Sequence, residues 1–244
     1  MVASDQGSFR GFRLYLTIRC CWCQSPGGMF PVMSHVIEQQ LRQWVSSARL
    51  RRYQRHPADT VELYMYNSEL ASHMSEVILH VEVLVRNVIH GKLSEANDSK
   101  DIPWYLDNDT YRFSKKMSRT LARAVSKAGG PAASQSTVVA EIPFGTWRFL
   151  LSTQYQTTVW PIVSPGFQGR PRSQRDRHEL YDSMTYLHEI RNRCAHSEPV
   201  FEHDLDTFLC AVSTVADFVD PKSTQWIKDT WFLRRRGRRF PSAL

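Results

Sequence analysis

The chain has 244 residues, of which 42% are hydrophobic and 23% are charged, a composition that excludes wholesale disorder and a fibrous protein. Its formal net charge is +7, which suggests a polyanionic partner. Residues 33–233 are neutral overall, but residues 110–180 within them carry +8, and the segment after residue 233 adds +5. The positive charge is therefore local, and residues 110–180 are the candidate surface for a polyanion.

Cysteine content and hydropathy indicate a reduced, cytoplasmic protein. Five cysteines do not make a disulfide framework in a chain of this length, and the cluster Cys20, Cys21 and Cys23 lacks a second pair at zinc-binding spacing. We therefore expect no metal and no cofactor. No apolar run approaches the roughly 20 residues that span a bilayer, so we expect no membrane association.

Residues 1–32 differ from the rest of the chain. They lack a sustained hydrophobic period and contain a Ser-Pro-Gly-Gly breaker at positions 25–28. We interpret them as a disordered or non-native N-terminal extension, and detection of Met1 at the native N-terminus by mass spectrometry would contradict a non-native origin. Patterned sequence begins at Met33.

From Met33 onward the hydrophobic residues recur at helical spacing almost throughout. A short apolar stripe covers residues 36–45. A longer stripe, over residues 63–89, keeps spacings of three and four for about seven turns. This longer stripe is the strongest structural signal in the chain, and Gly91 is the expected cap of its helix.

The middle of the chain predicts shorter elements. A basic helix is expected over residues 113–125, ended by the breaker Gly129-Gly130-Pro131. Two short helices, over residues 138–142 and 149–151, are expected to meet at Pro143-Phe144-Gly145. Residues 164–172 contain two prolines and two glycines and are expected to form a loop.

The C-terminal third continues the helical pattern. Helices are expected over residues 180–190 and 205–219, followed by a last amphipathic turn or two around Trp226 and Trp231. No internal repeat and no convincing β-hairpin is present. The sequence thus predicts an all-α helical bundle that forms one domain, residues 33–233, with a basic disordered tail over residues 234–244.

The residues that stand out chemically form the string Arg191-Asn192-Arg193-Cys194-Ala195-His196. Because Pro199 disfavours helix at the residue before it, the string is expected at or near a helix end. Five positions separate Arg191 from His196, which places them about 140° apart on an ideal helix. Two copies of the string can nevertheless meet across the two-fold axis of a dimer.

This cluster suits phosphodiester cleavage in RNA. A histidine, with an ordinary pKa of about 6.5, can take the proton of a 2′-hydroxyl or give one to a leaving oxygen. Arginine stabilises charge on the phosphorane oxygens, and asparagine can hydrogen-bond the phosphate or hold the histidine. Arg and His also occur at helix ends because they complement the helix dipole, so the string alone is a weak signal.

Five short motifs follow one another between Ser47 and Phe201. They read SARLRRY from residue 47, LYMYN from residue 63, EVLVRN from residue 82, FGTW from residue 144 and IRNRCAHSEPVF from residue 190. In this order they resemble the motifs of the Abi-like bacterial defence proteins (abortive infection, AbiD/AbiF type), whose core is a HEPN helical domain. The resemblance covers about two thirds of the chain, and the ordered set is far more specific than any single motif.

The resemblance implies a metal-independent endoribonuclease in which a homodimer brings two R-x-x-x-x-H motifs into one site. Carried over by position, Arg191 and His196 are the catalytic pair and Asn192 is the polar helper. Ser197 departs from the family pattern, which has a second histidine there. This departure removes a spare proton carrier but leaves His196 in place.

Further side chains are candidates for supporting the site or contacting RNA. Glu82 is the candidate support, although an ion pair with Arg86, one turn along the same helix, is the simpler interpretation. The basic helix can face either solvent or phosphates, and the arginines before the motif helix can guide RNA to His196. His178 and His188 are interpreted as surface or packing residues. The candidates for RNA contact are Arg86, Asn87, Lys115, Lys116, Arg119, Arg123, Arg172, Arg175 and Arg193.

We therefore predict a homodimeric endoribonuclease of abortive-infection defence, which cleaves RNA to a 2′,3′-cyclic phosphate and a 5′-hydroxyl. One alternative is a catalytically silent RNA-binding or RNA-guided scaffold, whose function would survive replacement of His196 by Ala. Another is a purely protein-binding member of a defence system, whose binding would depend little on salt. A non-coding RNA or an antitoxin is compatible with these interpretations as a further partner.

Overall fold

The computed structural model describes residues 38–169 and 173–235 of the chain. All of these residues belong to one of the two compact units into which the chain divides, the unit that starts at Ile37. The predicted N-terminal extension, residues 1–32, lies outside the described residues. The same holds for residues 236–244 of the predicted tail.

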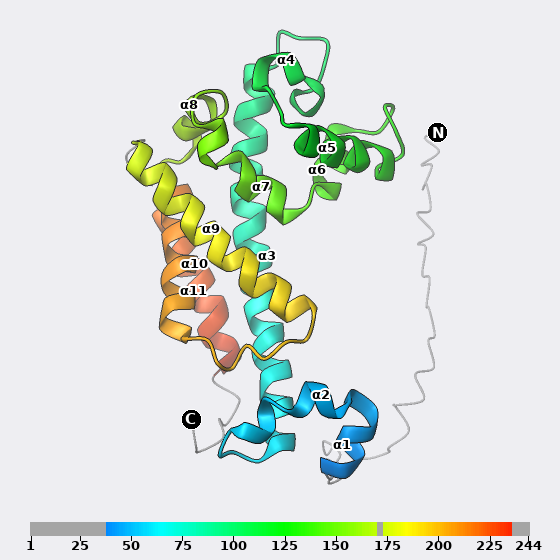
Figure 1. Cartoon of the computed structure of the whole chain (residues 1–244). Helices are drawn as coiled ribbons and strands as arrows, with labels where there is room; N and C mark the ends of the chain where they lie inside the picture. The colour runs from blue at the N-terminus through cyan, green and yellow to red at the C-terminus, as the bar shows by residue number, and fades with distance from the viewer. Residues whose placement is uncertain (1–37, 170–172, 236–244) are drawn as a thin grey trace, which may run out of the picture. The chain divides into compact units, whose positions relative to one another are not determined.

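The described ranges contain helices and no strand, which confirms the all-α class (Figure 1). Within them, no helix is both long enough and apolar enough to cross a membrane. The α-helices are α1 (Glu38–Val45), α2 (Ser47–Leu50), α3 (Thr60–Ala96), α4 (Asn108–Tyr111), α5 (Lys115–Lys127), α6 (Gln135–Glu141), α7 (Phe144–Leu150), α8 (Trp160–Val163), α9 (Gln174–Ala195), α10 (Leu205–Val219) and α11 (Pro221–Arg235). Short 3₁₀ helices are η1 (Tyr53–Arg55), η2 (Trp104–Leu106), η3 (Thr153–Tyr155) and η4 (Ser164–Gly166).

The longest helix, α3, is the element against which most of the other helices pack, namely α1, α7, α8, α9, α10 and α11 (Figure 1). Its buried residues follow the predicted stripe, and Met74, Ile78 and Val81 are completely shielded from solvent. Helices α9, α10 and α11 all contact α3, and α10 contacts both α9 and α11. Burial of each such side chain contributes roughly 1.5–3 kcal/mol. The core extends beyond these four helices to residues of α5, α6, α7 and α8.

Side-chain caps determine where three of the long helices begin. Asp59 accepts hydrogen bonds from two backbone N–H groups in the first turn of α3. Ser173 and Asp176 form a reciprocal capping box at the start of α9, and Asp204 caps α10 in the same way as Asp59 caps α3. Each cap contributes about 1 kcal/mol, because it satisfies N–H groups that the helix leaves without partners.

Several elements extend further than the sequence pattern predicts. Helix α3 does not end at Gly91 but continues to Ala96, because an interior glycine costs only about 1 kcal/mol and the packing beyond it outweighs that cost. Helix α7 starts at Phe144, directly after Pro143, and not at residue 149. Helix α11 has 15 residues, because Pro221 ends α10 and is also well suited to open the next helix. The expected disordered tail therefore begins inside a helix.

Two contacts position α9, the helix that carries the string RNRCAH. In the loop before it, Gly169 donates its N–H to the carbonyl of Phe218 (3.2 Å), and a Cβ at Gly169 would lie 1.6 Å from the carbonyl oxygen of Asp217. Only glycine allows this approach to α10. Arg177, which is 4% exposed, donates to the carbonyl of Leu151 (2.8 Å) and joins α9 to the end of α7.

Candidate active site

The string RNRCAH closes α9. His196 is the residue that ends the helix, and its N–H donates to the carbonyl of Asn192 (3.0 Å). Ser197 follows with a left-handed backbone (φ +52°), so the chain turns away immediately after His196. The side chains of Arg191 and His196 are exposed, and that of Asn192 is partly exposed. The polar groups of the string are therefore accessible to a ligand at a helix end, where Pro199 predicts them.

A buried asparagine on α3 holds the turn that follows His196. Asn67, which is 3% exposed, donates to the carbonyl of Glu198 (3.2 Å). Its side-chain oxygen accepts from the N–H groups of Val200 (2.6 Å) and Phe201 (3.2 Å). Because one amide satisfies three backbone groups more than 130 residues away in sequence, α3 determines where the end of α9 lies.

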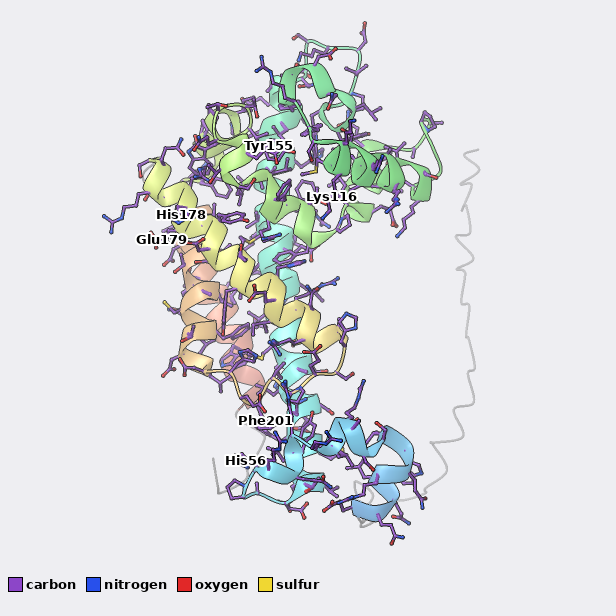
Figure 2. All side chains as sticks on the ribbon, in the orientation of Figure 1. His56, Lys116, Tyr155, His178, Glu179 and Phe201 are labelled. Atoms are coloured by element: carbon purple, nitrogen blue, oxygen red, sulfur yellow. The ribbon has the colours of Figure 1, made fainter. Side chains whose placement is uncertain are left out.

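Aromatic packing adds a second anchor to the same turn. The ring of Phe201 lies 5.3 Å from that of Tyr53, which in turn lies 5.4 Å from Tyr64 on α3. His56 contacts Phe201 edge-on at 5.7 Å, and the two labelled side chains lie close together in Figure 2. The motifs that begin at residues 47, 63 and 190 thus meet in space.

Glu82 links α3 electrostatically to the string. It is partly buried, and burial raises its pKa, while the positive charges of Arg191 and Arg86 act to lower it. Residue Arg191 comes from α9 and Arg86 from α3, so Glu82 faces charges from two helices. The expected direct ion pair between Glu82 and Arg86 is not among the ion pairs of the described residues, and the Nε atom of Arg86 is buried without a hydrogen-bond partner.

The second arginine of the string is engaged locally. Arg193 forms an ion pair with Glu198 (3.2 Å) across the turn, and both side chains are partly exposed. Such a pair contributes about 0–1 kcal/mol, so it does not prevent Arg193 from contacting a ligand. Burial lowers the pKa of His203, and the positive charge of Arg193 lowers it further. The sequence pattern does not distinguish this histidine.

A pocket of about 330 Å³ opens between α5, α7 and α9. Lys116 lines it from α5, Arg148 from α7 and His188 from α9. Arg148 donates through Nη1 to the hydroxyls of Tyr181 (3.3 Å) and Thr185 (3.2 Å) on α9. These bonds hold the guanidinium group against the same helix that ends in His196.

His188 connects this pocket to the string. Its ring stacks on Phe144, with centroids 5.7 Å apart, and a Cβ at Gly145 would lie only 3.0 Å from its Nε2 atom. Burial lowers the pKa of His188, and the charges of Arg148 and Arg191 lower it further. The imidazole of His188 is therefore influenced by two arginines, one in the pocket and one in the string, and both disfavour its charged form.

The remaining basic candidates lie elsewhere. Arg175 is in the first turn of α9, about 30 Å along the helix from His196, so it does not join the cluster. Arg172 lies outside the described residues. Asn87 is exposed on α3. The four candidates on α5 are all exposed, and only Lys116 among them lines the pocket; the set is Lys115, Lys116, Arg119 and Arg123.

The sequence pattern does not predict the part that two residues of this region play. It favours a surface or packing role for His188 and does not distinguish Arg148 from the other arginines. The sequence indicates these two residues only by their positions: Arg148 directly follows the FGTW motif, and His188 precedes His196 by two helical turns. Neither signal reveals that α7 and α9 are neighbours.

Within residues 38–169 and 173–235, no group of three or more His, Cys, Asp or Glu side chains is arranged to hold a metal ion. In comparisons with known proteins, the model of one family, described as Abi-like protein, matches residues 34–202, more than two thirds of the chain. No curated protein and no solved structure matches it.

Proposed function

We propose that this chain, which belongs to the Abi-like protein family, is a metal-independent endoribonuclease that acts in abortive-infection defence. The observation that carries the proposal is the accessible group of Arg191, Asn192 and His196 at the end of α9. We also propose that these helices form a HEPN domain of the AbiD/AbiF type. This part of the proposal rests on the order of the five motifs, three of which pack around the turn after His196.

The proposed reaction needs a base, an acid and a stabiliser of negative charge. A histidine removes the proton from a 2′-hydroxyl, whose oxygen then forms a bond to the adjacent phosphorus. The bond from phosphorus to the 5′-oxygen breaks, and this oxygen receives a proton from a second histidine. The products are a 2′,3′-cyclic phosphate and a 5′-hydroxyl, and the base and acid are His196 of the two subunits.

The other polar residues have supporting roles in this scheme. Arg191 stabilises the charge that develops on the phosphorane oxygens, and Asn192 donates a hydrogen bond to the phosphate. Glu82 is a positioning residue, because its carboxylate attracts the guanidinium group of Arg191 from the neighbouring helix. The positive charge of Arg86 acts on Glu82 as well, and the buried Nε–H group of Arg86 is a hydrogen-bond donor without a partner.

A homodimer follows from this mechanism, since each motif has one histidine. A surface suited to a second copy lies on α3, where apolar side chains remain exposed next to the end of α9. Leu79 is 57% exposed, and Met65 and Val83 lie on the same side of the helix. This face borders a hollow of about 420 Å³ that Cys194 and Ser197 also line, so a partner bound there would approach the string.

The test is cleavage of labelled single-stranded RNA by purified full-length protein in EDTA. We expect chelator-resistant cleavage that falls at least about 100-fold in His196→Ala and in Arg191→Ala, with unchanged circular dichroism. His178→Ala is the matched control, because His178 is exposed on the same helix, near its opposite end (Figure 2).

Unchanged cleavage by His196→Ala would overturn the catalytic assignment. RNA binding without cleavage in the wild type, equal in His196→Ala, would instead establish the catalytically silent scaffold. Absence of both binding and cleavage for every RNA tested would favour a protein-binding role.

A further inference from the structure

The pocket between α5, α7 and α9 has no part in the reaction described above. Its size, about 330 Å³, falls in the range of small-ligand sites and is sufficient for one nucleotide. Its wall combines cationic, hydroxyl and aromatic groups. The lining residues that matter here are Lys116, Thr120, Arg148, Phe149 and His188.

The charge of the pocket favours an anion. Lys116 and Arg148 contribute two positive charges, and no Asp or Glu belongs to its lining. Arg148 is already oriented by its bonds to Tyr181 and Thr185, so little side-chain entropy is lost when it binds a ligand. Its Nε–H is buried without a hydrogen-bond partner, and an unsatisfied buried donor of this kind favours the arrival of an acceptor.

The position of the pocket along α9 relates it to the string. His188, Asn192 and His196 follow at intervals of four residues, and side chains at this interval lie along one side of a helix. Eight residues correspond to about 12 Å of helix. The pocket therefore lies beside the proposed cleavage point on the same helix, and not at it.

We propose that this pocket is a subsite for the RNA substrate, in which Lys116 and Arg148 hold the phosphate of a nucleotide near the cleaved bond. The inference rests on the proposed function for the identity of its occupant, which is RNA. Half-buried Phe149 offers an apolar contact for the base or ribose of that nucleotide. His188, fixed by Phe144 and Gly145, forms the boundary between this phosphate and the one bound by Arg191.

The experiment measures RNA binding and not cleavage. Fluorescence anisotropy with a labelled single-stranded RNA is performed on full-length His196→Ala protein, to which Lys116→Met or Arg148→Gln is added. Each addition should weaken binding about tenfold and reduce the slope of log affinity against log salt by about 0.7, the value for one phosphate contact on a single strand. Lys222→Met and Arg55→Gln are the matched controls, because both side chains are exposed and neither lines the pocket.

The outcomes separate this inference from the proposed function. If the wild type binds RNA through Lys116 but does not cleave it, the nuclease proposal fails and the subsite stands. If Lys116→Met binds RNA with unchanged affinity and salt slope, the subsite is wrong; this variant avoids any folding defect, since its side chain is exposed. If a nucleoside monophosphate binds the wild type but not Lys116→Met, while RNA affinity is the same in both, the pocket serves a free nucleotide and the RNA subsite is overturned.

Discussion

At the scale of single residues, Asn67 explains how a surface motif receives a defined position. The turn that follows His196 contains three buried or partly buried backbone groups that Asn67 satisfies. Asn67 is itself 3% exposed, and of its three bonds the one from the N–H of Val200 is buried while the other two are partly buried. The asparagine of the motif at residues 63–67 is therefore a positioning residue for the string on α9.

We predict that Asn67→Ala lowers the free energy of unfolding by about 2–4 kcal/mol, because it leaves the buried N–H of Val200 and two partly buried backbone groups without their partner. RNA cleavage should fall as well, since the turn after His196 loses its anchor. Urea unfolding followed by circular dichroism gives the stability, with Asn87→Ala as the control on the same helix. Asn87 is exposed and should change stability by less than about 0.5 kcal/mol. A loss for Asn67→Ala no larger than that of the control would contradict the assigned role.

At the scale of elements, the far end of α3 is held by a buried polar network. Asn97, which caps α3, donates to Asp107 (3.2 Å) and accepts from the hydroxyl of Tyr111 (2.5 Å). Asp107 also pairs with Lys100 (2.5 Å) and caps α4 through the N–H of Thr110. This network explains why α3 continues past Gly91, since its last turn is joined to α4.

The pKa of Asp107 provides a pH test of this network. Burial acts to raise the pKa, but hydrogen bonds from Lys100, Thr110 and Asn97 outweigh it and lower the pKa to about 2. A depressed folded-state pKa stabilises the fold above the ordinary value of 3.8, and this stabilisation is lost as pH falls toward 2. We expect Asp107→Asn to lose about 1–2 kcal/mol at neutral pH.

The measurement is the free energy of unfolding of wild type and Asp107→Asn across this acid range. Their difference should begin to shrink as the pH falls through about 4 and should be lost only below about pH 2, where Asp107 is protonated in the folded state as well. Asp109→Asn, an exposed neighbour on α4, is the control and should show no such convergence. A difference between wild type and Asp107→Asn that stays constant down to pH 2 would show that the charge of Asp107 does not stabilise the network.

At the scale of the whole molecule, the proposed dimer depends on the exposed face of α3. Most apolar side chains of this helix are buried, so exposed Met65, Leu79 and Val83 are exceptions that a second copy would cover. The same helix contacts both α9 and α11. Trp226 of α11, which packs on His80 of α3 and is half exposed, extends the apolar area.

We predict that Leu79→Glu converts the dimer to a monomer and abolishes RNA cleavage, because a charge at the interface would be buried without a partner. Sedimentation equilibrium gives the oligomeric state. Leu106→Glu is the matched control, since Leu106 is also about half exposed but belongs to η2, outside this face. Full cleavage by a monomeric Leu79→Glu protein would exclude a composite site, and a dimeric Leu79→Glu protein would place the interface elsewhere.

Much of the architecture follows from the amino-acid sequence alone. Spacings of three and four predict α3, α5, α9 and α10, because helix periodicity is a local property of the chain. Proline at position 199 predicts that the string lies at a helix end. The order of five motifs identifies the family, which the family model matches independently over residues 34–202. The least accurate predictions concern helix ends, as at Gly91 and Pro221, where packing outweighs local preference.

The surroundings of the string were decided only by the tertiary structure. Glu82 faces Arg191 from a position 109 residues earlier, and Lys116 meets Arg148 and His188 in one pocket. Whether such side chains lie close together depends on which helices are neighbours and on how each helix is rotated about its axis. The hydrophobic period determines neither the neighbours nor the rotation. A sequence can thus show which residues have the chemistry to bind a phosphate, but the packing of the helices decides which of them lie close enough together to bind the same one.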